Sequence, residues 1–171
     1  MNIVSRISRH TKLSMKAVKH RAHQTPPFMI IFINSICNLT CEHCFYWKEL
    51  NKRNDLSFEE FEQLSLELGD FENLNLSGGE PFIRGEFGEI CDLFIRNNNV
   101  KNIYVPTNGY FTDKTEKALR RVLENKSLKL FVCEISLDGM PDYHNKFRGN
   151  AQSFKKAMET YQMLAALQAE D

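Results

Sequence analysis

The chain has 171 residues, of which 42% are hydrophobic and 26% charged, and its 22 Lys and Arg balance 22 Asp and Glu. This length and composition are typical of one globular domain with a real core. A net charge of zero argues against nucleic acid or an anionic membrane as the main partner. The sequence also contains no run of about eighteen apolar residues that would span a bilayer.

The charges are unevenly distributed along the chain. Residues 1–25 contain six Lys or Arg and no acidic residue, whereas the remainder carries 16 basic against 22 acidic side chains, a net charge of −6. This first segment lacks the long apolar core of a secretory signal. A targeting peptide, a membrane-surface helix and a solvated arm remain open for it. We expect a basic helical arm over 1–25, ended by Pro26 and Pro27, and a single domain over 26–171.

The cysteine content indicates a reducing compartment. Five cysteines are an odd number, and no export signal accompanies them. Metal-bound or free thiols fit this better than a disulfide framework does, so we expect a cytoplasmic protein.

Strands and helices are predicted to alternate along the rest of the chain. Residues 28–36 (FMIIFINSI) are β-branched, aromatic and apolar on both faces, which predicts a buried parallel strand. A helix follows, with a capping box at Ser57 and Glu60 and its end at Gly69. Further strands are predicted over 74–77, 101–106 and 129–137. The apolar residues predicted to face the core from the four helices are Phe58, Phe61, Leu64 and Leu68; Phe87, Ile90, Cys91, Phe94 and Ile95; Ala118, Leu119, Val122 and Leu123; and Phe154, Ala157, Met158, Tyr161, Leu164 and Ala165.

Four such units in a row predict a parallel α/β sheet with right-handed crossovers. An unusual loop follows each strand: CNLTCEHC (37–44), SGGEP (77–81), PTNG (106–109) and SLDG (136–139). In parallel α/β folds, ligands bind at the carboxyl ends of the strands. We therefore expect the four loops to converge on one site.

The three cysteines of the first loop have spacings that suit a single metal centre. A structural zinc site needs four ligands, usually in two separated pairs, and His43 inside the run is an awkward fourth. Cys91 and Cys133 fall on a helix face and within a strand, so packing explains them more simply. An iron–sulfur cubane held by three thiolates keeps one iron without a protein ligand. We favour the cluster, with zinc and unbound thiols as the alternatives.

This loop resembles the CxxxCxxC signature of radical S-adenosylmethionine (SAM) enzymes, and the resemblance extends over roughly residues 28–165 because the later loops follow in the expected order. It implies a partial TIM-like (β/α) barrel, with four of the usual six units present. It also implies that Cys37, Cys41 and Cys44 hold a [4Fe–4S] cluster whose fourth iron binds SAM. Reductive cleavage of SAM then gives a 5′-deoxyadenosyl radical for hydrogen abstraction, and a donor such as flavodoxin or ferredoxin supplies the electron.

The same resemblance places several further residues at the cofactor. The glycines of the GGEP loop permit close backbone approach to the SAM ammonium, Ser136 and Asp138 point to the same side towards SAM polar groups, and Arg148 either bonds the SAM carboxylate or braces the loop through backbone carbonyls. We expect Phe45, which follows the last cysteine, to belong to the core. The cofactor-binding residues implied are Gly78, Gly79, Glu80, Pro81, Thr107, Asn108, Ser136, Asp138 and Arg148.

The loop order also resembles that of the SPASM-type peptide-modifying branch, which implies a peptide or protein substrate. The last two barrel strands are absent from this sequence. A fragment of a longer product is the simplest expectation, and pairing with a partner chain is a second. A non-catalytic iron–sulfur or zinc-binding module, which acts through its open sheet edge, is the alternative from another class.

Overall fold

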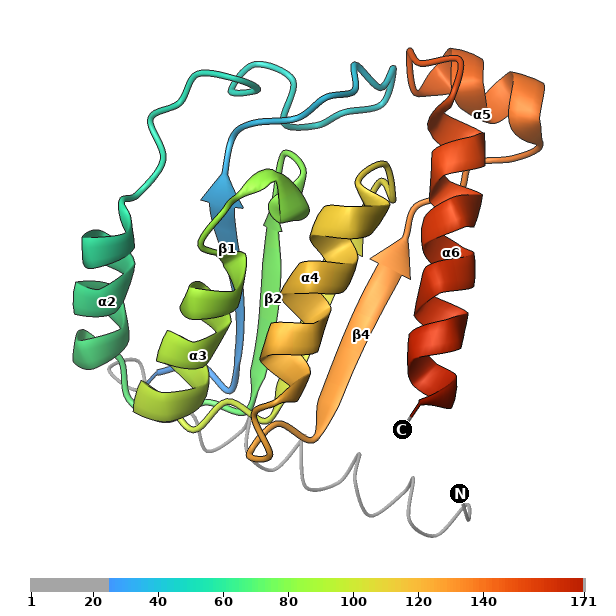
Figure 1. Ribbon diagram of the computed structural model, residues 1–171. Coiled ribbons are helices and arrows are strands. Elements are labelled where there is room, and N and C mark those ends of the chain that lie inside the picture. Colours follow the sequence, from blue (N-terminus) through green and yellow to red (C-terminus); the bar gives the residue numbers. More distant parts are fainter. Residues whose placement is uncertain (1–24, 171) are drawn as a thin grey trace, which may run out of the picture.

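The computed structural model describes residues 25–170, so the basic arm predicted over 1–25 lies, apart from Thr25, outside the described residues. Four parallel strands form one sheet in the order β1-β2-β3-β4, with a helix after each strand (Figure 1). The elements are β1 (Phe28–Asn34), α2 (Phe58–Glu67), β2 (Asn73–Gly78), the 3-10 helix η1 (Pro81–Ile83), α3 (Phe87–Asn97), β3 (Asn102–Thr107), α4 (Thr112–Leu123), β4 (Leu130–Ile135), α5 (Pro141–Phe147) and α6 (Ser153–Ala169).

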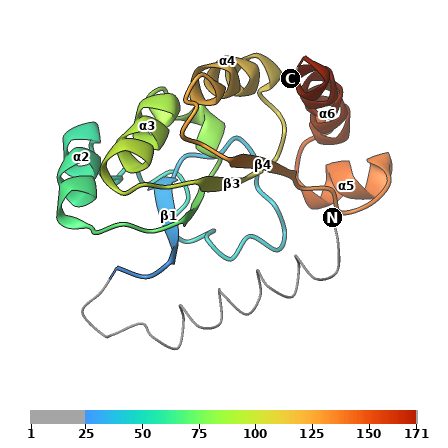
Figure 2. The same cartoon turned by 90° about the horizontal axis from the view of Figure 1, so that it is seen from below.

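The predicted α/β class and the four βα units are confirmed, and the fold is that of a partial TIM-like barrel. The four long helices, α2, α3, α4 and α6, lie on one side of the sheet (Figure 2). Every predicted core residue of α3 is buried, as are Leu119 and Val122 of α4. The core therefore lies between the sheet and these helices.

The capping box of α2 is also confirmed: the Ser57 N–H donates to Glu60 Oε2 at 2.7 Å, and the Glu60 N–H donates to Ser57 Oγ at 3.2 Å. The predicted helix end at Gly69 was wrong. The helix ends at Glu67, and Leu68 already has extended backbone. Gly69 is held differently, because its N–H donates to Thr25 Oγ1 at 2.8 Å.

The expectation that β1 is buried on both faces was also wrong. Phe28, Ile30 and Phe32 are 47%, 59% and 39% exposed. Their alternation places them on the sheet face away from the helices, which no helix of the described chain covers (Figure 2). We call this surface the open face.

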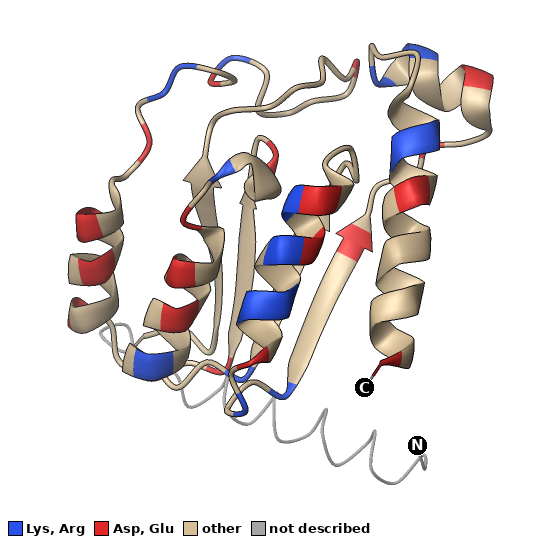
Figure 3. Ribbon diagram, in the orientation of Figure 1, with Lys and Arg blue, Asp and Glu red and all other residues tan. Residues whose placement is uncertain are grey.

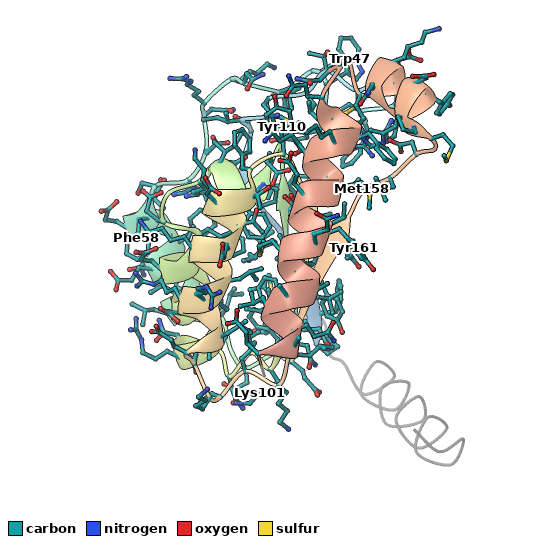
Figure 4. The ribbon with its side chains drawn as sticks, turned by 45° about the vertical axis from the view of Figure 1, so that its right-hand side comes forward. Trp47, Phe58, Lys101, Tyr110, Met158 and Tyr161 are labelled. Carbon is teal, nitrogen blue, oxygen red and sulfur yellow. The ribbon has the colours of Figure 1, made fainter. Side chains whose placement is uncertain are left out.

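The core face predicted for the last helix was too wide. Tyr161 of α6 is 56% exposed and points away from the core (Figure 4). Ala165 is exposed as well. The helix lies at the edge of the sheet beside α4 and α5 and buries only the narrow stripe Ser153, Ala157 and Thr160.

Charged side chains lie mainly on the helices and loops (Figure 3). Glu134, near the end of β4, is the one charged residue in the four strands. Within residues 25–170, no helix has both the length and the apolar character needed to cross a bilayer.

Candidate functional site

The four strand-end loops meet around one cavity of about 170 Å³ at the carboxyl end of the sheet. It brings together the cysteine loop and parts of the three later loops, as the sequence predicts. Of the residues predicted for the site, only Pro81 and Asp138 do not line it. The residues that do are Cys37, Cys41, Cys44, Gly78, Gly79, Glu80, Thr107, Asn108, Ser136 and Arg148.

A larger hollow of about 570 Å³ lies between α4, β4 and α6. Its lining includes Lys129, Leu164 and Cys133 and none of the residues predicted for the site. Size therefore does not identify the functional cavity here, because the chemically distinctive side chains surround the smaller one.

The chain that follows the cysteines holds one side of their loop. Asn51 accepts a hydrogen bond from the Cys37 N–H at 3.0 Å, and its own N–H donates to the Ser35 carbonyl at 2.8 Å. The Arg53 N–H donates to Ser35 Oγ at 3.0 Å. Both Asn51 and Arg53 have left-handed backbone, with φ of 62° and 57°. Sequence reasoning missed this anchor, although Asn tolerates that conformation better than most residues do.

Helix α5, which was also missed, holds the other side of the cysteine loop. The Glu42 N–H donates to the Phe147 carbonyl at 3.0 Å. The His43 ring stacks on Phe147 with 4.6 Å between ring centroids and 8° between planes. Pro141 at the first turn of α5, after the turn at Gly139, is the sequence signal that would have found this helix.

The two glycines of the GGEP loop are required by close contact with the chain that leads into the cysteines. The Gly79 N–H donates to the Asn34 carbonyl at 2.9 Å, and the Glu80 N–H donates to the Ile36 carbonyl at 2.7 Å. A Cβ on Gly79 would lie 2.3 Å from the Ile36 oxygen, and one on Gly78, where φ is 144°, would lie 2.3 Å from the Asn34 oxygen. Neither site has room for a side chain.

Replacing Gly79 by alanine is therefore expected to lower the free energy of unfolding by about 2 kcal/mol or more, because the backbone must move apart. Gly85→Ala is the matched control. A Cβ at Gly85 has no neighbour within 4 Å, so its effect should stay within about 0.5 kcal/mol. Urea denaturation of both variants checks this, and equal stabilities would contradict the close packing.

The side chain of Glu80 joins the second loop to the third. It is 1% exposed. Its carboxylate accepts hydrogen bonds from Thr107 Oγ1 at 2.8 Å, the Asn108 N–H at 2.8 Å and the Phe82 N–H at 3.2 Å. Burial raises the pKa of Glu80, and these hydrogen bonds, with the charge of Arg148, only partly oppose the rise. Glu80 thus fixes the positions of two loops at the cavity.

Asn108 links the third loop back to the first. Its Nδ2 donates to Asn38 Oδ1 at 3.0 Å and lies 3.8 Å from Cys37 Sγ. Asn38 Nδ2 is buried and has no hydrogen-bond partner among the described residues. The structure therefore leaves a buried donor unsatisfied beside the first cysteine, where a ligand would satisfy it.

The predicted alignment of Ser136 with Asp138 was wrong. β4 ends at Ile135, so strand alternation no longer applies, and Ser136 lines the cavity whereas Asp138 does not. Asp138 instead accepts two bonds from Arg148, at 2.5 Å from Nε and 3.0 Å from Nη2. Burial alone would raise the pKa of Asp138, but the hydrogen bonds and charge of Arg148 hold it below its usual value.

The prediction that Arg148 braces its loop through backbone carbonyls was wrong, because its guanidinium bonds the carboxylate of Asp138 instead.

His144, which contacts Asp138, is fully buried. Its Nδ1 accepts a hydrogen bond from the Asp138 N–H at 3.3 Å, and its Nε2 lies 3.0 Å from Ser153 Oγ. Burial lowers the pKa of His144, and so does the charge of Arg148. A neutral ring with its proton on Nε2 satisfies both contacts.

Phe45 corrects another expectation, since it is 81% exposed and lines the cavity instead of the core. It contacts Phe32 edge-on at 6.1 Å between centroids. Phe45, which lines the cavity, and Phe32, which lies on the open face, therefore form a continuous aromatic surface between the two.

The arrangement of thiols suits a cluster better than a single ion. Within residues 25–170, no three His, Cys, Asp or Glu side chains converge closely enough to hold one metal ion. A cubane does not need such convergence, because each thiolate binds a different iron. Burial raises the pKa of Cys37 to about 11 and also raises that of Cys41, where Arg148 opposes it. Metal binding would deprotonate these thiols, and three thiolates lining one cavity are donors that a [4Fe–4S] cluster takes.

Comparison with known proteins gives a consistent result. Residues 31–170 match the model of the radical SAM superfamily. The chain is 31% identical over 135 residues to Fe-coproporphyrin III synthase of Methanosarcina barkeri, which is 77% of this chain and 32% of that protein. It is 32% identical over 130 residues to the probable GTP 3′,8-cyclase of Methanococcus maripaludis, and 30% identical over 88 residues to the GTP 3′,8-cyclase of Actinobacillus pleuropneumoniae serotype 3.

These alignments cover 72% and 48% of this chain, and 41% and 26% of the two cyclases. The chain thus spans well under half the length of these curated relatives. Members of the matched superfamily use a [4Fe–4S] cluster together with SAM.

Proposed function

Because the chain belongs to the radical SAM superfamily, we propose that its cavity binds a [4Fe–4S] cluster and SAM and is the radical-generating site of an enzyme. When bound, this pair supplies a 5′-deoxyadenosyl radical by one-electron reductive cleavage of SAM, for hydrogen abstraction from a substrate. The observation that carries the proposal is the convergence of Cys37, Cys41 and Cys44 with the three later loops on one cavity.

Each loop has a separate task in this proposal. The three cysteines bind three irons, and the backbone of Gly78 and Gly79, which lines the cavity, faces the methionine part of SAM. Glu80 keeps the second and third loops in register through Thr107 and the Asn108 N–H. Pro81 begins η1 and so fixes the exit of the second loop.

The remaining residues complete the walls of the cavity. Ser136 offers a hydroxyl to the polar groups of SAM, and Asn108 places an amide between the third loop and the first cysteine. Asp138 contributes indirectly, because it orients Arg148. An electron donor of the flavodoxin or ferredoxin type, in an anaerobic cytoplasm, would supply the electron.

The substrate is a separate proposal. The order of the loops favours the SPASM-type branch and a peptide, whereas the names of the relatives indicate a porphyrin or GTP. In each case the substrate would lie near Phe32 and Phe45, where the open face meets the cavity. Adding a peptide, GTP or coproporphyrin III to the reduced protein and comparing the rates of 5′-deoxyadenosine formation distinguishes these classes.

The test of the radical-generating function is anaerobic reconstitution of the chain with iron and sulfide. The proposal predicts 5′-deoxyadenosine, detected by chromatography after addition of SAM and dithionite. A Cys44→Ala chain treated in the same way is the control and should give none. Stoichiometric zinc without iron in the wild-type chain would contradict the proposal. A cluster without 5′-deoxyadenosine would favour a non-catalytic cluster-binding module.

A further inference from the structure

Arg148 has one guanidinium nitrogen that the Asp138 ion pair does not use. Nε and Nη2 bond the two Asp138 oxygens, whereas Nη1 lies 3.7 Å from Cys41 Sγ. The carboxylate therefore binds one edge of the guanidinium, and the opposite corner faces the sulfur. Arg148 is 8% exposed, so water competes little for this contact.

We infer that Arg148 donates a hydrogen bond to the Cys41 thiolate and thereby raises the reduction potential of the bound cluster. The inference rests on the proposed function, in which Cys41 is a cluster ligand. Arg148 binds no iron itself in this inference. It is a positioning residue that sets the reduction potential of the cluster through the ligand Cys41.

The surroundings hold this nitrogen in place. Asp138 fixes the guanidinium plane through two parallel bonds, a geometry that lysine cannot reproduce. The backbone adds a second constraint, because the Thr40 N–H donates to the Arg148 carbonyl at 3.4 Å. Gly149, with φ of 67°, lies so close to Thr40 that a Cβ would come within 2.3 Å of its Oγ1. The arginine and the cysteine loop are therefore fixed relative to each other.

The expected effect follows from charge. Reduction adds one electron to the cluster, and part of the added negative charge resides on the ligating sulfurs. Hydrogen bonds to these sulfurs and nearby positive charge both stabilise the reduced form. The Arg148–Asp138 pair is neutral overall, but it is a dipole with its positive end at Cys41, and its burial weakens screening by water. Among the described residues, Cys37 Sγ by comparison receives only neutral donors, from the Leu39 N–H at 3.4 Å and from Asn108.

The test is the midpoint potential of the reconstituted chain, measured by EPR-monitored titration in the absence of SAM. Arg148→Gln should shift the potential to a more negative value at unchanged iron and sulfide content. Arg148→Lys keeps the positive charge but cannot form the two parallel bonds to Asp138. Its midpoint potential should lie between those of Arg148→Gln and the wild type. Lys146→Gln removes the same charge from an exposed position on α5 and should leave the potential unchanged.

A second measurement detects the contact directly in the wild-type protein, with Arg148→Lys as its control. In wild-type protein labelled with ¹⁵N-arginine, pulsed EPR of the reduced cluster should detect coupling to a guanidinium nitrogen, and Arg148→Lys should lose it. Unchanged potentials in both Arg148 variants would overturn the inference, as would absence of the coupling. So would variants that only weaken SAM binding, because Arg148 would then contact SAM instead. A wild-type chain that takes up no iron fails at the proposed function itself, before any potential is measured.

Discussion

Cys41→Ala is expected to abolish cluster assembly, whereas Cys91→Ala should leave it intact. Cys41 lines the cavity, and its loss leaves two thiolates for a cluster that needs three. Iron and sulfide in the anaerobically reconstituted protein should fall from about four of each per chain to nearly none. The absorption band of the cluster should disappear with them.

Cys91 is the matched control because it is fully buried in α3 and lies outside the cavity. Its side chain is packed in the hydrophobic core between the sheet and the helices, so its thiol is not placed to bind a cluster held by the cysteine loop. The alanine variant should lose some stability and keep full iron content. Full iron in Cys41→Ala, or loss of iron in Cys91→Ala, would show that the cysteine loop does not hold the cluster.

Glu80→Gln is the second change with a large expected effect. Glutamine has one acceptor oxygen where the carboxylate has two. Its amino group must therefore face either the Asn108 N–H or the two donors to the other oxygen, the Thr107 hydroxyl and the Phe82 N–H. A buried donor left unsatisfied costs about 1–3 kcal/mol. We therefore expect a loss of about 2 kcal/mol in the free energy of unfolding and weaker SAM binding, because two cavity loops lose their common anchor.

Glu62→Gln, at an exposed position of α2, makes the same chemical change and should have almost no effect on either quantity. Urea denaturation measures the stability, and equilibrium binding of SAM to the reconstituted protein measures the affinity. If Glu80→Gln matched Glu62→Gln in both measurements, Glu80 would not be the link between the loops.

The pH dependence of stability supplies an independent check on Glu80. Burial raises its pKa above the ordinary value of 4.5, so in that pH range the folded state binds more protons than the unfolded state. Stability from this group is then gained as the pH falls through the raised pKa and lost as the pH rises. The deficit of Glu80→Gln relative to the wild type should therefore widen from neutral pH towards 4.5. A constant deficit would contradict the raised pKa.

The strands, the long helices and the convergence of the loops could be predicted because each rests on a local pattern. Apolar spacing identified the buried face of α3, and parallel topology alone places strand-end loops together. The same spacing failed for β1 and for Tyr161, because apolar character does not reveal whether a neighbouring element covers it. Exposure of Phe28 and Ile30 follows because the four long helices of the described residues lie on the other side of the sheet.

Parts of the site could not be predicted because they depend on contacts between distant segments. Asn51 holds the Cys37 N–H across 14 residues of chain, and Arg148 reaches Cys41 across 107. Neither pairing leaves a periodic signal. The glycines of the GGEP loop were recognised, but their contact with Asn34 and Ile36 appears only when the chain is folded.

The central claim is that three cysteines leave one iron of a cluster open to SAM within this cavity. The most direct test is the EPR spectrum of the reduced, reconstituted chain with and without SAM. Binding at the open iron changes the electronic environment of the cluster, so the spectrum should shift when SAM is added. A spectrum that SAM leaves unchanged, in protein with full iron and sulfide content, would contradict the claim.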